Sequence, residues 1–217
     1  MKNILLLGAT GSIGKSCLNV IRQNKENFHL FGIGLGSNLD KAQEIVKEFN
    51  PDHIFVAQSK IDKSHNFWQV HSNTLKSEDE LKGLIQDPCV DIVISAISGF
   101  AGLKASYFAI EAGKTILVAN KESIVAAGDI LMPLADMKDS EIIPVDSEHN
   151  ALYQCLPRER NLNEISKILI TASGGPFREK SLSDLKRVSL EDAMKHPTWS
   201  MGAKITIDSA TLVNKCL

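Results

Sequence analysis

The sequence is poor in cysteine, in aromatic residues and in net charge. Its four cysteines are scattered and form no C-x-x-C pair: Cys17, Cys89, Cys155 and Cys216. This pattern argues against a disulfide framework or a thiolate zinc site and favours a reducing compartment. The formal net charge is only −2, whereas nucleic-acid binding needs a clustered basic surface, so nucleic acid is not an expected partner.

Long hydrophobic runs are also missing. No apolar stretch approaches the roughly 20 residues that a membrane-spanning helix needs, so we expect no membrane partner. The first apolar run is short, ends in a glycine loop and has no cleavage-site pattern, unlike a signal peptide. A cytoplasmic location is therefore the default expectation. With 217 residues, of which 43% are hydrophobic, the chain can form one large core or two modest domains.

Short apolar runs alternate with amphipathic segments in the first 146 residues. Strands are predicted over residues 2–7, 28–35, 53–57, 90–96, 115–119 and 141–145. Helices are predicted over residues 13–24, 39–50, 77–86, 102–112 and 123–137. This alternation is typical of βαβ units, and it predicts an α/β fold with a doubly wound, Rossmann-like parallel sheet. We assign this domain to residues 1–146.

The pattern changes after residue 146. A short helix is predicted over residues 150–156, strands over 165–172 and 204–207, and a long connection with one short helix over 173–201. A last helix should begin near Ser209, so that the chain ends inside it. We therefore predict a second, partial α+β domain over residues 147–217, incomplete at its C-terminus.

A glycine-rich loop follows the first predicted strand and opens the first predicted helix. It reads Gly8-Ala9-Thr10-Gly11-Ser12-Ile13-Gly14. Glycines allow a tight turn and let backbone N–H groups approach a pyrophosphate, which the helix N-terminus also attracts. The loop predicts dinucleotide binding, and the alternative is a merely tight strand-to-helix turn.

The end of the second predicted strand discriminates between cofactors. NAD sites place an acidic residue there to bind the ribose 2′-hydroxyl, but this chain has Gly36, Ser37 and Asn38, with no acid before Asp40. Without the carboxylate a 2′-phosphate is not repelled, and Ser37 and Asn38 can donate to it, which favours NADP. The alternative is an ordinary turn that leads into Asp40 as a helix cap.

Two carboxylates, a hydroxyl and an imidazole stand within four residues after the sixth predicted strand. They are Asp146, Ser147, Glu148 and His149. If the strand continues through them, the two carboxylates point to the same side. Like charges at short range repel unless a cation lies between them, and Mg²⁺ or Mn²⁺ prefers such oxygen ligands. The segment predicts a divalent metal site.

A third polar segment, Asn120-Lys121-Glu122, ends the fifth predicted strand. Ligands of doubly wound sheets bind beyond the carboxyl ends of the strands. Lys121 can there meet a substrate hydroxyl and the cofactor together, and Glu122 can accept from a ribose hydroxyl. The alternative is that Asn120 caps the next helix while Lys121 and Glu122 are solvated.

Six motifs together resemble one enzyme family. In order they are GATGSIG, ANKES, VDSEH, TASGGPF, HPTWSMG and IDSATLVNK, and they resemble the 1-deoxy-D-xylulose 5-phosphate reductoisomerases. The resemblance implies NADPH-dependent, metal-assisted conversion of 1-deoxy-D-xylulose 5-phosphate to 2-C-methyl-D-erythritol 4-phosphate in non-mevalonate isoprenoid biosynthesis. Family proteins are longer and homodimeric, so the chain resembles their N-terminal portion, without their C-terminal helical domain.

The resemblance also implies roles for individual residues. Cofactor contacts would come from Thr10, Gly11, Ser12 and Ile13 at the pyrophosphate, Gly36, Ser37 and Asn38 at the 2′-phosphate, and Asn120 and Glu122 at the nicotinamide. The metal would bind Asp146 and Glu148, with a third carboxylate just beyond Leu217. Catalytic residues would be Lys121, Ser147, Glu148, His149 and His196. Substrate contacts would come from Ser147, His196, Trp199 and a phosphate pocket of Ser173, Ser209, Asn214 and Lys215.

Residues 173–202, including His196, Trp199 and Met201, resemble the mobile lid of that family. Such a lid would keep water from a reactive aldehyde intermediate. Because the third metal ligand falls outside the sequence, we expect the 217-residue chain to bind NADPH but to turn over little or no substrate.

Two other functions stay open at this point. Another two-domain NAD(P) dehydrogenase, of the semialdehyde or homoserine type, shares the glycine spacing. A semialdehyde dehydrogenase needs an activated cysteine, and the only candidate, Cys155, has neighbours that do not activate a thiol. The other alternative is a non-enzymatic nucleotide-binding module, which would bind NADPH and ignore divalent metal.

Overall fold

The computed structural model describes residues 1–57, 64–71, 73–156, 162–172, 174–198 and 202–213. The chain divides into two compact units, Met1–Asp146 and Ser147–Leu217. Within the described ranges, no helix is both long and apolar enough to span a membrane.

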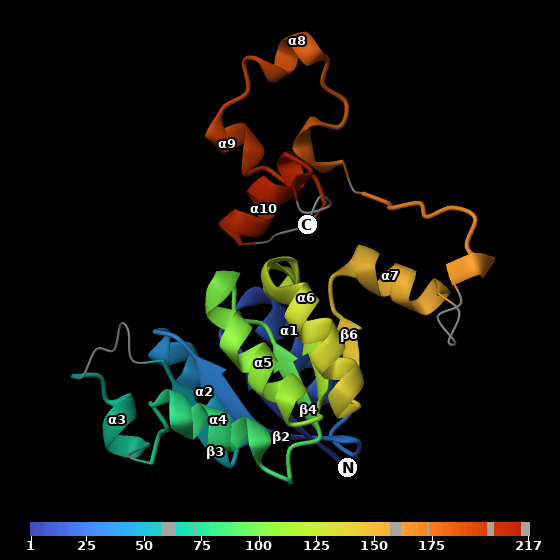
Figure 1. The fold of residues 1–217 in the computed structure, drawn as a ribbon. Helices are drawn as coiled ribbons and strands as arrows, with labels where there is room; N and C mark the ends of the chain where they lie inside the picture. Colours follow the sequence, from blue (N-terminus) through green and yellow to red (C-terminus); the bar gives the residue numbers. More distant parts are fainter. Residues whose placement is uncertain (58–63, 72, 157–161, 173, 199–201, 214–217) are drawn as a thin grey trace. The chain divides into compact units, whose positions relative to one another are not determined.

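The first unit is built on one parallel sheet of six strands (Figure 1). Its strand order is β3-β2-β1-β4-β5-β6, and each neighbouring pair is parallel. The strands are β1 (Lys2–Leu7), β2 (Phe28–Leu35), β3 (His53–Val56), β4 (Ile92–Ser95), β5 (Thr115–Val118) and β6 (Ile142–Pro144). The predicted α/β, doubly wound parallel sheet is therefore confirmed.

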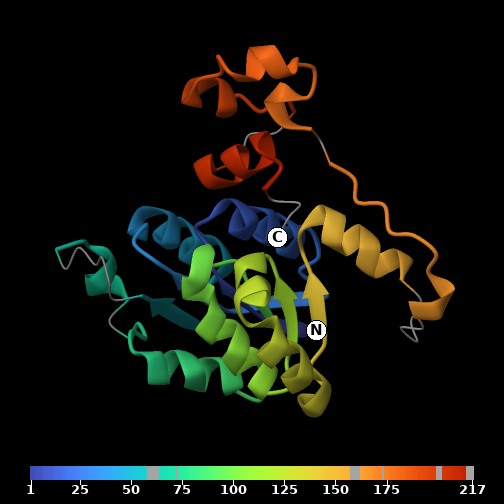
Figure 2. The same cartoon turned by 45° about the horizontal axis from the view of Figure 1, so that its top comes forward.

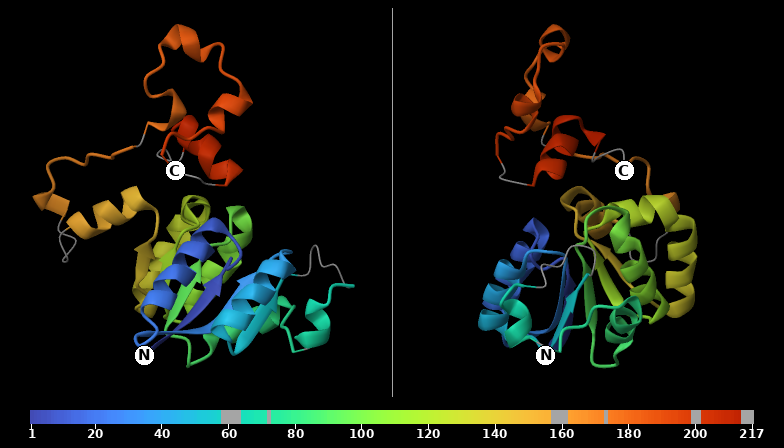
Figure 3. Two further views of the ribbon diagram at one scale, coloured as in Figure 1. Left: turned by 180° about the vertical axis from the view of Figure 1, so that it is seen from behind. Right: turned by 90° about the vertical axis from the view of Figure 1, so that its left-hand side faces the viewer.

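Helices cover both faces of this sheet, as the right-hand view of Figure 3 shows. One face carries α1 (Ser12–Gln23), α2 (Leu39–Phe49) and α3 (Phe67–Val70). The other carries α4 (Glu78–Gln86), α5 (Leu103–Glu111) and α6 (Lys121–Lys138). A 3-10 helix, η2 (Gly99–Gly102), leads from β4 into α5.

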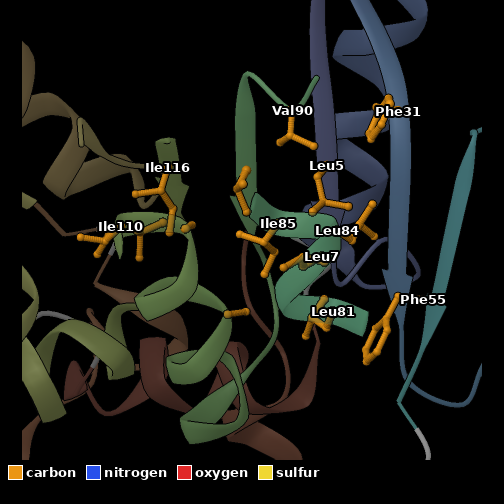
Figure 4. Close-up of a cluster of buried hydrophobic side chains, with 14 of the residues drawn as sticks. Leu5, Leu7, Phe31, Phe55, Leu81, Leu84, Ile85, Val90, Ile110 and Ile116 are labelled. Carbon is orange, nitrogen blue, oxygen red and sulfur yellow. The ribbon is translucent and has the colours of Figure 1, made fainter. Parts of the chain in front are cut away.

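Alternating side chains of the central strand β1 build two separate cores. Leu5 and Leu7 point to the face of α4, α5 and α6, where they join Ile85, Ile110 and Ile116 (Figure 4). Ile4 and Leu6 point to the face of α1 and α2. Successive side chains of a strand face opposite sides of the sheet, so a strand that is apolar throughout has to be covered on both faces.

Local signals explain where the helices begin. A capping box begins α4, because the Ser77 hydroxyl accepts from Glu80 N while the Glu80 carboxylate accepts from Ser77 N at 2.8 Å. Hydrogen bonds that the Glu80 carboxylate accepts from Lys76 N, from Ser77 N and from the Ser77 hydroxyl lower the pKa of Glu80 below its usual range. Such a box satisfies backbone donors that the first helical turn otherwise leaves without partners.

The second unit consists of short helices among its described residues. They are α7 (Ser147–Cys155), η3 (Leu162–Glu164), η4 (Gly175–Phe177), α8 (Leu182–Leu185), α9 (Leu190–Ala193) and α10 (Ala203–Ala210). Figure 2 shows α8 and α9 as single turns between loops. Helix α10 contacts both η4 and α9.

Both strands predicted for the second unit are wrong. Residues 165–172 form no strand in the described structure, and Ile168, Leu169 and Ile170 are more than half exposed. A strand needs a hydrogen-bonded neighbour, and the described part of this unit offers none. Residues 204–207 lie inside α10, which begins at Ala203 rather than near Ser209. Its buried residues Thr206, Ser209 and Ala210 follow the helical spacing, not an alternation.

Replacing Ile116 with alanine should destabilise the first unit strongly. The side chain is completely buried between the sheet and the helices, so its loss leaves a cavity and should cost about 2–5 kcal/mol. Urea unfolding followed by circular dichroism measures this. The control is Val20→Ala on α1, where the side chain is 53% exposed and the expected change is within about 0.5 kcal/mol. Equal losses in the two variants would contradict the assignment of the core.

Candidate functional site

The glycine loop joins β1 to α1 at the point where the strand order reverses. Strand β1 pairs with β2 on one side and with β4 on the other, and ligands of such sheets bind at this switch point. Gly8 N and Ala9 N both donate to Gly34 O, at 2.8 and 3.0 Å. Gly8 has φ +91°, and a Cβ there would lie 2.3 Å from Ala96 O. The loop is therefore held between the ends of β2 and β4.

The start of α1 packs tightly on the same loop. A Cβ on Gly14 would lie 2.4 Å from Ala9 O, so only glycine permits this contact. The N-cap residue is Gly11, which has no side chain to accept from the first amides of the helix. Gly11 and Ser12 are exposed, while Thr10 and Ile13 are half-buried. This geometry suits an anion at the helix N-terminus.

The end of β2 carries Gly36, Ser37 and Asn38, all of which are exposed. The Asn38 side chain caps α2 by accepting from Lys41 N at 3.1 Å, so Asn38, and not Asp40, is the cap. Asp40 Oδ1 instead lies 3.2 Å from Nε2 of His65. Asp40, the first acidic residue after β2, is thus paired with the imidazole of His65.

The Asn120 side chain caps α6, as one of the two interpretations of the sequence had it. Asn120 is 2% exposed, and its Oδ1 accepts from Ser123 N at 2.8 Å and from the Ser123 hydroxyl at 2.5 Å. Its Nδ2 donates to the carbonyl oxygens of Ile97 and Gly99. Ser123 was not predicted as a site residue, although its place three residues after Asn120 is the usual capping distance.

A lysine and a carboxylate meet at the carboxyl ends of β5 and β6. Lys121 Nζ lies 3.3 Å from Asp146 Oδ2, and the two side chains are only 14% and 22% exposed. These strands pair side by side, which is why the residues that follow them come together. Because both charges are largely shielded from water, they interact more strongly than a surface pair. Glu122 is half-buried in the first turn of α6.

The expected extended run through Asp146 and Glu148 is wrong. Strand β6 ends at Pro144, and α7 begins at Ser147, so Glu148 and His149 lie in a helical turn. Both are half-buried, whereas Ser147 is exposed. No three His, Cys, Asp or Glu side chains converge as a metal site within the described ranges. Of the two carboxylates that the sequence suggested as ligands, Asp146 lies in the short connection between β6 and α7, and Glu148 lies in the first turn of α7.

Two further predicted site residues of the second unit, His196 and Ser209, lie within the described ranges. His196 is half-buried, and its Nδ1 accepts from Thr198 N at 3.2 Å. Ser209 is 4% exposed near the end of α10, where its carbonyl oxygen would lie 2.8 Å from a Cβ on Gly175. The remaining predicted residues lie outside the described ranges: Ser173, Trp199, Met201, Asn214 and Lys215.

Two family models match nearly the whole chain. The model for 1-deoxy-D-xylulose 5-phosphate reductoisomerase matches residues 4–128, and the model for the C-terminal domain of the same enzyme matches residues 142–217. Among curated relatives, the reductoisomerase of Geobacillus sp. (strain WCH70) is 46% identical over 220 residues, and that of Bacillus subtilis (strain 168) is 46% identical over 222. Both alignments cover 100% of this chain but only 57% of the relative.

Solved structures agree with the sequence comparisons. A DOX-P reductoisomerase in complex with NADPH, fosmidomycin and magnesium superposes with a TM-score of 0.88 at 40% identity, over 99% of this chain and 56% of that one. The reductoisomerase of Zymomonas mobilis in complex with NADPH gives a TM-score of 0.85 at 36% identity, over 99% and 55%. The chain thus spans little more than half the length of its relatives, and it belongs to the 1-deoxy-D-xylulose 5-phosphate reductoisomerase family.

Proposed function

We propose that this chain supplies the NADPH site and part of the catalytic site of a reductoisomerase that converts 1-deoxy-D-xylulose 5-phosphate to 2-C-methyl-D-erythritol 4-phosphate. One observation supports this most directly. A single edge of the sheet carries both the glycine loop after β1 and the Lys121–Asp146 pair after β5 and β6. A dinucleotide and a polar reacting group can therefore be bound beyond the same strand ends.

The proposed cofactor site runs along this edge. The pyrophosphate binds the loop of Thr10, Gly11, Ser12 and Ile13, where Gly11 and Ser12 are exposed and the start of α1 favours an anion. The 2′-phosphate lies at Gly36, Ser37 and Asn38. Asp40, the first acid after these residues, is paired with the imidazole of His65, which supports NADPH over NADH. Asn120 and Glu122 lie at the nicotinamide end.

The residues around Asp146 suit a divalent cation such as Mg²⁺ or Mn²⁺. Carboxylate oxygens are the ligands these ions prefer, and the ammonium of Lys121 beside Asp146 supports a negatively charged carboxylate at this position. We infer that Asp146 and Glu148 hold the ion. When bound, it would polarise the substrate carbonyl and stabilise developing negative charge on oxygen.

The remaining residues bind and orient the substrate in this proposal. Lys121 lies where it reaches both the cofactor and a substrate hydroxyl, and Ser147, His149, His196 and Trp199 flank the reacting carbons and exclude water. The substrate phosphate binds hydroxyl, amide and ammonium donors, which together suit a phosphate: Ser173, Ser209, Asn214 and Lys215. The complete protein works as a homodimer on this sugar phosphate.

The decisive experiment is substrate-dependent oxidation of NADPH with Mg²⁺ or Mn²⁺. It should be run on the 217-residue chain and on the complete product of its gene. We expect turnover by the complete product, and cofactor binding with little or no turnover by the 217-residue chain. A complete product that binds NADPH but leaves 1-deoxy-D-xylulose 5-phosphate unchanged would exclude the reductoisomerase and favour a nucleotide-binding module.

Replacing Gly14 with alanine should weaken NADPH binding by about tenfold or more. The new Cβ would be forced to within 2.4 Å of Ala9 O, so the loop must move away from the pyrophosphate position. Titration of NADPH fluorescence measures this on the 217-residue chain. The control is Gly83→Ala in α4, where a Cβ meets nothing within 4 Å and alanine favours the helix. Unchanged affinity in the Gly14 variant would contradict the proposed pyrophosphate site.

Replacing Asp146 with asparagine should weaken Mn²⁺ binding by the complete gene product about tenfold or more, since an anionic ligand is lost. Electron paramagnetic resonance of free Mn²⁺ reports the affinity without requiring turnover. Asp129→Asn, at an exposed position of α6, is the matched control and should bind the ion like the unaltered protein. Equal affinities in both variants would place the ion elsewhere.

A further inference from the structure

Buried polar side chains cluster at the carboxyl ends of β4 and β5. Ser95, Ser106, Asn120 and Ser123 are each at most 2% exposed. The hydroxyls of Ser95 and Ser106 lie 3.0 Å apart, and Ser106 Oγ donates to Gly102 O at 3.1 Å. Buried polar groups destabilise a fold unless they are hydrogen-bonded, so a network of this kind at a ligand-binding edge suggests a role beyond packing.

The amide of Asn120 is fully used by protein groups. A primary amide offers two donor hydrogens and two acceptor lone pairs. Nδ2 donates to Ile97 O and to Gly99 O, the latter at 2.5 Å. Oδ1 accepts from both the amide and the hydroxyl of Ser123. A cofactor could bind this side chain only by displacing one of these four partners.

We propose that Asn120 is a positioning residue. Its side chain ties the loop of residues 97–102 to the start of α6, and so shapes the nicotinamide end of the site without contacting the nicotinamide. The influence of Asn120 on NADPH binding rests on the proposed function, whereas its restraint of the loop of residues 97–102 does not.

The loop is built closely around this amide. A Cβ on Gly102 would lie 2.9 Å from Asn120 Nδ2 and 2.9 Å from Ile97 O, so only glycine permits the approach. Phe100, the largest side chain of the loop, is 69% exposed and does not anchor it. Ile97 is the partly buried apolar contact with the core. The hydrogen bonds from Asn120 to Ile97 O and Gly99 O are therefore a main restraint on the loop.

The test is Asn120→Ser, because serine is also a good N-cap but is too short to donate to the loop. Two readouts are needed on the 217-residue chain. Hydrogen exchange of the amides of residues 97–103 should become about tenfold faster or more, since two buried hydrogen bonds are lost. NADPH affinity, from fluorescence titration, should fall about tenfold.

Ser77→Ala is the matched control. It removes the cap of α4, whose hydroxyl bonds Glu80 and not the loop of residues 97–102. The loss of stability should resemble that of other lost caps, with no change in exchange at residues 97–103 or in NADPH affinity. If Asn120→Ser fails to fold, Ser123→Ala takes its place, because it removes one donor that orients the amide and should speed the same exchange by a smaller factor.

Three outcomes overturn the proposal or part of it. Unchanged exchange at residues 97–103 together with weaker NADPH binding would make Asn120 a direct cofactor ligand. Unchanged exchange and unchanged affinity would leave it a helix cap alone. Faster exchange in a chain that does not bind NADPH even when unaltered would support the loop restraint and refute the proposed function instead.

Discussion

The pairing of β1 with neighbours on both sides is the constraint on which the first unit depends. Residues Leu5, Leu6 and Leu7 are completely buried, and β1 pairs in parallel with β2 and with β4. Parallel neighbours require crossover helices, and an apolar strand in the centre requires those helices on both faces. The same pairing places the glycine loop at the reversal of strand order, where ligands of such sheets bind.

The site edge shows a different kind of packing from the core beneath it. Below the strand ends, leucine and isoleucine side chains fill the space, and such packing tolerates small changes of shape. At the ends, buried hydroxyls and the Asn120 amide connect particular carbonyl oxygens. Hydrogen bonds have preferred directions, so they restrict the loop to one conformation in a way that apolar contacts do not.

Predictions from sequence succeeded where local pattern and tertiary environment agree. The apolar runs of the first unit are strands because helices cover them, and the helix predicted from residue 77 begins there because Ser77 and Glu80 form a capping box. In the second unit, Ile168, Leu169 and Ile170 have the composition of a strand but no strand neighbour among the described residues. Residues 204–207 were predicted as a strand, yet the burial of Thr206, Ser209 and Ala210 follows the spacing of a helix.

The sequence by itself determined the parallel α/β class, the glycine loop between the first strand and the first helix, and the family, because these depend on short-range periodicity and on motifs whose residues are adjacent in the chain. Only the tertiary structure decided that Lys121 meets Asp146, that Asp40 pairs with His65, and that the Asn120 amide binds the carbonyls of Ile97 and Gly99. Each of these contacts joins residues more than 20 positions apart. Their partners are set by strand order and helix packing, which no local pattern specifies.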